Sequence, residues 1–151
     1  MTMTTIEAQH DFRAPPQTLW DLIADFGNIE AWWPAGGAVN IERVELEGTG
    51  IGMVRHIYNE GMPAPVSERL DHLDPAALVW RLSIVGTKPA GLLQYQATGR
   101  ITALDDGGSR VEYLGEFEAE AGGESQAREF LQGAYALMFN GLEQAAAARV
   151  R

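Results

Sequence analysis

Residues 125–149 have the sequence SQAREFLQGAYALMFNGLEQAAAAR and follow the pair Gly122-Gly123. Apolar side chains recur along this segment at the three- and four-residue spacing of one helix face. They are Phe130, Leu131, Ala134, Tyr135, Met138 and Leu142. The pattern predicts a long amphipathic helix whose apolar stripe packs against a second layer of structure.

Upstream of this helix the apolar residues alternate with a period of two, which is typical of strands with one buried face. Turn residues rich in Gly, Pro and Asp separate the candidate strands. These strands cover residues 38–47, 51–59, 66–74, 78–85, 92–104 and 110–120. Their short connections favour antiparallel hairpins.

The first part of the chain adds a strand over residues 4–12 and two short helices. Pro15 and Pro16 fit the first turn of one helix, and a second covers residues 28–32. The order of elements predicts an α+β fold, a curved antiparallel sheet of seven strands around the C-terminal helix, with residues 1–151 in one domain. Such a sheet leaves a concave apolar interior, which is the usual form of a small-molecule site.

The composition argues against several classes of protein. The chain has 151 residues, 46% of them apolar, with 21 acidic and 11 basic side chains and no Cys. Nucleic-acid binding is not expected, because phosphate recognition needs several cations on one face. Membrane insertion is not expected, because no run of about 18 apolar residues occurs. The N-terminus lacks a signal-peptide pattern, so we expect a cytoplasmic protein, either a monomer or a homodimer.

Neither a metal nor a cofactor is expected. The three histidines, His10, His56 and His72, do not stand at metal-ligand spacing. Alternation places His56 on the outer face of the sheet and His72 on the inner face, in phase with Glu68. Residues 48–52, GTGIG, join two strands and open no helix, which indicates a turn and not a phosphate-binding loop.

A charged pair is expected on the inner wall of the sheet. If residues 55–68 form one hairpin, Arg55 lies opposite Glu68 and Ile57 opposite Val66, and the apolar neighbours put both charges on the inner face. Such a pair either supports the structure or contacts a polar group of a ligand. In the second case Glu68 is the best candidate for a general base.

Aromatic residues are expected at the same interior. Tyr95 and Tyr113 are expected to point to the inner face of the sheet. For Tyr95, the expectation follows from alternation with the apolar residues Leu93 and Ala97. Their hydroxyls either orient a ligand or bond within the core. The pair Trp32-Trp33 is either a lid packed on the core or a stacking platform, and Trp33 is the better candidate for ligand contact.

In order along the chain, several motifs resemble the Bet v 1-like, START-like helix-grip proteins (the SRPBCC superfamily), including the polyketide cyclase/dehydrase group. The resemblance spans nearly the whole chain. Its motifs are Ala14-Pro15-Pro16 with Leu19-Trp20, Trp32-Trp33, Gly50-x-Gly52-x-x-Arg55, Gly61-Met62-Pro63-Ala64, Glu68-Arg69-Leu70 and Asp74.

The middle segment is similar to plant abscisic-acid receptors, whose ligand gate is a Gly-Leu-Pro-Ala loop. This similarity implies a gate loop at residues 61–64, with Met62 and Pro63 near the ligand. It also implies a pocket wall formed by Trp33, Ile57, Glu68, Leu82, Ile84, Tyr95, Phe130, Ala134, Tyr135 and Met138. The strand pattern adds Tyr113 to this wall. The receptors' anchoring lysine aligns with Ala31, and the one lysine of this chain is Lys88. Hormone reception is therefore not expected.

Two functions remain open at this point. The first is binding of a small hydrophobic or aromatic molecule, polyketide-, terpenoid- or lipid-like, between the sheet and the C-terminal helix. The alternative is an enzyme of the cyclase, aromatase or lyase kind, in which Glu68 removes a proton and Tyr95 or Arg55 stabilises an enolate. A sensor that binds a protein partner through the gate loop is a third class.

Overall fold

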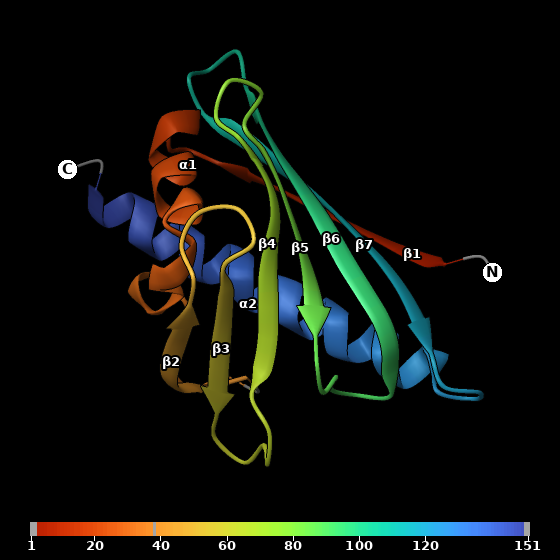
Figure 1. Cartoon of the computed structure of the whole chain (residues 1–151). Coiled ribbons are helices and arrows are strands. Elements are labelled where there is room, and N and C mark those ends of the chain that lie inside the picture. Colours follow the sequence, from red (N-terminus) through yellow and green to blue (C-terminus); the bar gives the residue numbers. More distant parts are fainter. Residues whose placement is uncertain (1–2, 38, 150–151) are drawn as a thin grey trace.

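The computed structural model describes residues 3–37 and 39–149, in which a curved antiparallel sheet lies across one long helix (Figure 1). The strands are β1 (Thr4–Phe12), β2 (Ile41–Glu47), β3 (Val54–Asn59), β4 (Val66–Asp74), β5 (Val79–Val85), β6 (Leu92–Ala103) and β7 (Ser109–Ala119). The helices are α1 (Pro16–Ala24), the short 3-10 segment η1 (Phe26–Ala31) and α2 (Glu124–Arg149). The expected α+β helix-grip fold is confirmed. Ala38, the first residue of the expected strand 38–47, lies outside the described residues.

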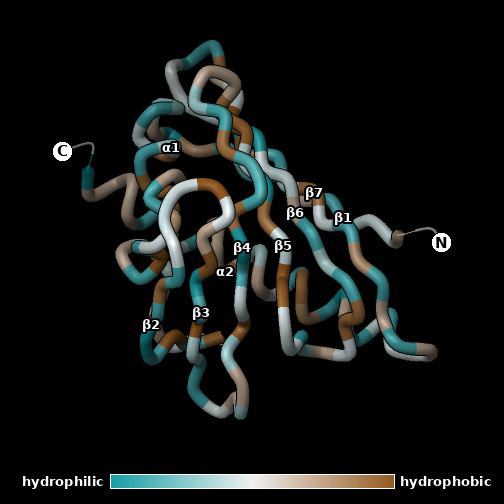
Figure 2. Tube along the Cα trace, viewed as in Figure 1, coloured by the Kyte–Doolittle hydropathy of each residue, from teal (hydrophilic) through white to brown (hydrophobic). Residues whose placement is uncertain are grey.

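The order of strands in the sheet is β1-β7-β6-β5-β4-β3-β2, so the chain places β1 beside its last strand. The two strands that end the sheet are therefore β1 and β2. Hydrophobic and hydrophilic residues alternate along the strands, as Figure 2 shows. The inward residues pack against the buried stripe of α2, which includes Leu131, Tyr135, Met138 and Leu142. The helix face predicted from the sequence is the face that the sheet covers.

Two irregularities in the strands change the inward phase. The register of β4 and β5 shifts between Leu70 and His72, so that Leu73 lies opposite the buried Trp80. His72 consequently faces outward and is exposed, and the expectation that it faces inward is wrong. The cause is one extra residue in β4, which reverses the faces of the residues beyond it.

The second irregularity lies at the start of β6. The register of β6 and β7 shifts between Leu92 and Gln94, which leaves Leu92 buried and Leu93 47% exposed. Leu93 was therefore a wrong guide to the phase of this strand. Tyr95 and Ala97 nevertheless face inward, as expected.

The segment between β2 and β3 is a turn, as its sequence indicates. Gly48, Gly50 and Gly52 have φ values of +79°, +68° and +97°, a region that side chains disfavour. Among the helices of the described chain, none has the length and apolar character that crossing a bilayer requires.

Candidate functional site

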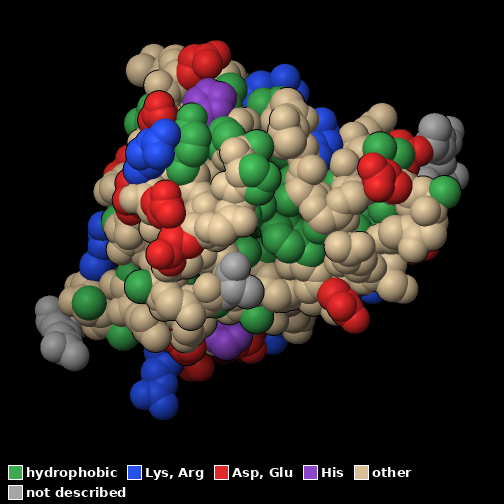
Figure 3. Space-filling view, turned by 90° about the horizontal axis from the view of Figure 1, so that it is seen from below, with side chains coloured by type: hydrophobic (Ala, Val, Ile, Leu, Met, Phe, Trp, Pro, Cys, Tyr) green, Lys and Arg blue, Asp and Glu red, His purple; other side chains and the backbone are tan. Residues whose placement is uncertain are grey.

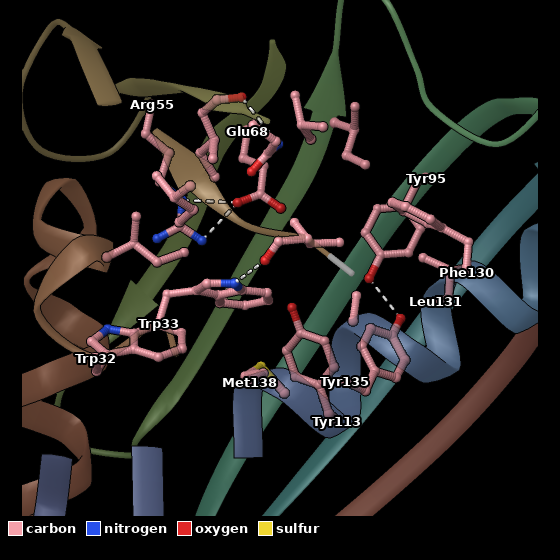
Figure 4. A pocket seen from close by; sticks show the side chains of 18 residues that line it. Trp32, Trp33, Arg55, Glu68, Tyr95, Tyr113, Phe130, Leu131, Tyr135 and Met138 are labelled. Atoms are coloured by element: carbon pink, nitrogen blue, oxygen red, sulfur yellow. Dashed lines mark hydrogen bonds and ion pairs between the residues drawn. The ribbon is translucent and has the colours of Figure 1, made fainter. Parts of the chain in front are cut away.

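A cavity of about 90 Å³ lies between the inner face of the sheet and α2 (Figure 4). Hydrophobic side chains also gather in a hollow on the face of the molecule seen from below in Figure 3. Most small-molecule pockets are larger, about 300–1,000 Å³. A ligand of more than one ring therefore has to displace side chains of the wall.

The charged pair lies on the wall formed by β3 and β4. Arg55 is opposite Glu68, and Ile57 opposite Val66, so the predicted register is confirmed. Arg55 Nε and Nη2 lie 2.8 Å and 2.7 Å from the same oxygen, Glu68 Oε1. Among the described residues, Glu68 Oε2 accepts no hydrogen bond. One carboxylate oxygen is thus fixed by the pair and the other is free to accept a hydrogen bond.

Arg55 is held from a second side as well. Its Nη1 donates to the backbone oxygen of Phe26 at 2.9 Å, and its guanidinium lies 3.8 Å from the centre of the Phe26 ring. The side chain is 7% exposed. Because η1 supplies both contacts, the position of Glu68 depends on how η1 packs against β3.

Three tyrosines line the opposite wall. The Tyr95 and Tyr135 hydroxyls are 2.6 Å apart, and the Tyr113 ring meets the Tyr135 ring edge-on, with 4.9 Å between centroids. Figure 4 shows the hydroxyl of Tyr113 separate from this pair, and no described residue hydrogen-bonds to it. It is therefore available to a ligand.

Burial determines how these tyrosines ionise. Loss of hydration raises the pKa of Tyr95 and of Tyr113 well above the ordinary value, and Tyr135 and the charge of Glu68 raise both further. On Tyr113 alone, Arg55 and Tyr95 act in the opposite direction and lower the pKa by smaller amounts. The pKa of Tyr135 is also raised by burial. The hydroxyls therefore keep their protons at neutral pH and act as neutral donors or acceptors.

The two tryptophans close the side of the cavity next to η1. Their ring centroids are 5.9 Å apart, and Trp33 Nε1 donates to the backbone oxygen of Val39 at 2.9 Å. Trp32 is buried and Trp33 half-buried, and both line the cavity. Phe130, also half-buried, lines the cavity from α2 and lies beside Tyr95 in Figure 4.

Most residues of the predicted pocket wall lie together. Those that line the cavity are Trp33, Arg55, Ile57, Glu68, Ile84, Tyr95, Tyr113, Phe130, Ala134, Tyr135 and Met138. Three do not. Leu82 is 3% exposed and lies in the packed core between Leu70 and Ala97 of the neighbouring strands. Met62 and Pro63 belong to the turn beyond β3 and β4, which extends past the end of the sheet in Figure 1.

The sequence did not single out several other lining residues. They are Ile29, Val39, Ile41 and Asn59. Leu131, Val66 and Trp32 also line the cavity; the sequence had placed them on the helix stripe, on the inner face of the hairpin and in the tryptophan pair, without naming them as pocket wall. Asn59 shares the strand phase of Arg55 and Ile57, a signal that could have identified it. Ile29 and Val39 come from η1 and a loop, where no strand phase exists. In residues 3–37 and 39–149, no three His, Asp or Glu side chains gather closely enough to hold a metal ion.

Solved structures share this fold. An aromatase/cyclase, ZhuI from Streptomyces sp. R1128, is 23% identical with a TM-score of 0.77, over 99% of this chain and 96% of its own. Norcoclaurine synthase from Thalictrum flavum is 12% identical with a TM-score of 0.81, over 100% of this chain and 99% of its own. An uncharacterised protein from Bacillus thuringiensis is 22% identical with a TM-score of 0.79, over 95% of this chain and 99% of its own.

Sequence comparison extends the likeness from fold to family. Among curated proteins, none matches the sequence. Residues 3–147, however, match the family described as polyketide cyclase / dehydrase and lipid transport. That range contains every strand, α1, η1 and nearly all of α2, and with them every residue that lines the cavity. The chain therefore belongs to the polyketide cyclase / dehydrase and lipid transport family, as its motifs led us to expect.

Proposed function

We propose that the protein binds a small hydrophobic or aromatic molecule, polyketide-, terpenoid- or lipid-like, in the cavity under α2. The observation that carries this proposal is the pairing of an aromatic wall with two free polar atoms, Glu68 Oε2 and the Tyr113 hydroxyl. An apolar site with a few convergent polar groups is the usual architecture for orienting a small ligand. The family description, which includes lipid transport, supports the same proposal.

Each part of the site has a role in binding. The aromatic rings of Trp33 and Phe130 supply apolar contact, and because both are half-buried they can move when a larger ligand enters. Glu68 Oε2 accepts a hydrogen bond from a hydroxyl or amine of the ligand. Tyr113, which keeps its proton, donates to a ligand carbonyl. Arg55 positions Glu68 and does not need to touch the ligand.

A second candidate function is proton abstraction from a ligand, as in a cyclase, aromatase or lyase. It is favoured by the presence of a free carboxylate oxygen and a free phenol in one cavity. Glu68 would take a proton from a carbon beside a carbonyl, and the electron pair would move to the carbonyl oxygen. Tyr113 suits the role of holding that oxygen better than Tyr95, whose hydroxyl already bonds Tyr135.

The variant Glu68→Gln tests both candidates. Aromatic, polyketide-like and fatty compounds are screened by thermal shift, and each hit is recovered and analysed by mass spectrometry. At about 100 times its Kd, a ligand should add about 2.7 kcal/mol to the stability of the folded protein. We expect hits that return unchanged and bind Glu68→Gln more weakly. Glu45→Gln, a change at an exposed glutamate of β2, is the matched control and should leave binding unaltered.

The outcomes separate the two functions. A hit converted by the wild type but not by Glu68→Gln, with affinity retained, establishes an enzyme and replaces the carrier proposal. Equal binding by wild type and Glu68→Gln removes Glu68 from the ligand contact. The absence of any hit across the three compound classes contradicts the proposal of a hydrophobic-ligand site.

A further inference from the structure

Asn59 is a buried polar residue in an otherwise apolar part of the cavity. It ends β3, lies opposite Ile41 of β2 and is 4% exposed. Its Nδ2 donates to the backbone oxygen of Ile57 over 3.4 Å, whereas its Oδ1 is buried and has no hydrogen-bond partner in the described chain. Its neighbours on the cavity wall, Ile41 and Val66, offer no side-chain donor.

The orientation of this amide follows from its surroundings. The carbonyl oxygen of Ile57 can only accept a hydrogen bond, so the amide nitrogen must face it. That leaves Oδ1 as a buried acceptor without a partner among the described residues, on a residue that lines the cavity. A buried acceptor without a partner destabilises a folded protein, and a leucine of similar size would avoid this loss. The amide is therefore better explained by a group that it meets when a ligand is bound.

We propose that Asn59 is a second polar anchor of the cavity, which accepts a hydrogen bond from a hydroxyl or amine at the end of the ligand nearest the turn between β3 and β4. This inference rests on the proposed function, because it assumes that a ligand occupies the cavity. It specifies the ligand further: an apolar body with a hydrogen-bond donor at each end, one for Glu68 and one for Asn59.

The strand geometry sets the distance between the two anchors. Arg55, Ile57 and Asn59 alternate on the inner face of β3, and Arg55 lies opposite Glu68. Asn59 is four residues from Arg55, and four residues of a strand span about 13 Å. Because Glu68 lies opposite Arg55, the anchors Glu68 and Asn59 lie at separate ends of the cavity wall. An elongated ligand of two rings, or a chain of similar length, can reach both once the half-buried rings of Trp33 and Phe130 move aside.

The chemistry of the anchors also excludes a class of ligand. Both Glu68 Oε2 and Asn59 Oδ1 are acceptors, and Glu68 carries a negative charge. A ligand that presents a carboxylate at either end would bring acceptor against acceptor. The inference therefore favours diols, diphenols and amino alcohols over ionised fatty acids.

The test uses three probes that share one frame: biphenyl, para-hydroxybiphenyl and para,para′-dihydroxybiphenyl. Binding is followed by calorimetry and by tryptophan fluorescence, in the full-length wild type, Asn59→Leu and Asn59→Asp. In the wild type, we expect the second hydroxyl to tighten binding about fivefold or more. Asn59→Leu should lose this gain without weakening the binding of biphenyl. Asn59→Asp retains an acceptor oxygen and should retain the gain.

Thermal stability without any probe gives a second readout. If Oδ1 lacks a partner in the free protein, Asn59→Leu should unfold at a higher temperature than the wild type. A lower unfolding temperature would show that the amide serves the structure, and would overturn the inference. The inference is also overturned if the second hydroxyl still tightens binding in Asn59→Leu. In either case, the proposal of a hydrophobic-ligand site stands as long as the wild type binds the three probes. If no probe binds the wild type, the proposed function fails, and the inference fails with it.

Discussion

The ion pair between Arg55 and Glu68 permits a test of the site that needs no ligand. We predict that Arg55→Met and Glu68→Gln each destabilise the protein, and that the double variant is less destabilised than the sum of the two. The reason is that each single change leaves one buried charge without its partner. The double variant has neither charge.

The contacts give the expected size of the effect. Arg55→Met removes one hydrogen bond and one ion-pair contact to Glu68, a hydrogen bond to the Phe26 backbone and the stacking on the Phe26 ring. Removing one partner of a buried pair costs about 3–5 kcal/mol. Glu68→Gln keeps an oxygen that Arg55 can reach, so its cost should be lower, about 1.5–3 kcal/mol. A coupling energy of about 2 kcal/mol between the two sites is expected.

The measurement is unfolding in guanidinium chloride, followed by the fluorescence of the four tryptophans and by far-ultraviolet circular dichroism. The matched control is Arg69→Met, which breaks an exposed ion pair with Asp71 on the outer face of the same strands. The Arg69 side chain is 48% exposed, so its loss should cost at most about 1 kcal/mol. If Arg55→Met costs no more than Arg69→Met, or if the two changes at the buried pair are additive, the reasoning is refuted.

Two further predictions concern the tyrosine wall. Because burial raises the pKa of Tyr113, the folded protein keeps a proton that the unfolded chain loses near pH 10. The contribution of Tyr113 to stability is therefore fully present below about pH 10 and falls by up to about 1.4 kcal/mol per pH unit above it, and Tyr95 and Tyr135 add falls of the same sign. Tyr113→Phe should lessen this fall in urea unfolding at about pH 9–11, and an unchanged slope would contradict the assignment. A methyl group at Gly115 would collide with the Tyr135 hydroxyl, so Gly115→Ala should cost about 1–3 kcal/mol and disturb the bond to Tyr95. Gly133→Ala, in open space on α2, is the control and should stabilise by about 0.5–1 kcal/mol; equal effects of the two changes would be inconsistent with the crowding at Gly115.

The periodicity of the sequence was enough to predict the fold and the central pair of the site. The sequence predicts that Arg55 lies opposite Glu68, because β3 and β4 alternate in polarity and are joined by a short turn. Once the position of that turn is known, the hairpin has only one register. The extra residues near Asp71 and Leu93 were not predictable in this way. An inserted residue in a strand carries no distinctive composition, and its effect is visible only in the pairing with the neighbouring strand.

The size of the cavity and its unpaired atoms depend on side-chain conformations that no pattern encodes. The sequence places Tyr95 and Tyr113 on one inner wall. It does not show that the Tyr95 hydroxyl hydrogen-bonds to Tyr135, whereas the Tyr113 hydroxyl has no such partner in residues 3–37 and 39–149. It places Asn59 in phase with Arg55, but the missing partner of its Oδ1 depends on how the amide meets Ile57. These details arise from packing among elements that are distant in the sequence.

The polar groups of the cavity are arranged with opposite character on its two sides. Glu68 Oε2 and Asn59 Oδ1, on residues of β3 and β4, are acceptors without a partner in the described part of the chain. Tyr113, on β7, keeps its proton because burial raises its pKa, and so it donates. A ligand with hydroxyl ends and an internal carbonyl therefore has one favoured orientation across the cavity. Enolisation needs the same two kinds of group, a base at the carbon beside the carbonyl and a hydrogen-bond donor at the carbonyl oxygen. Whether the site binds or converts its ligand then depends on which ligand atom faces Glu68 Oε2. A ligand hydroxyl at that place is bound, and a ligand carbon beside the carbonyl is deprotonated.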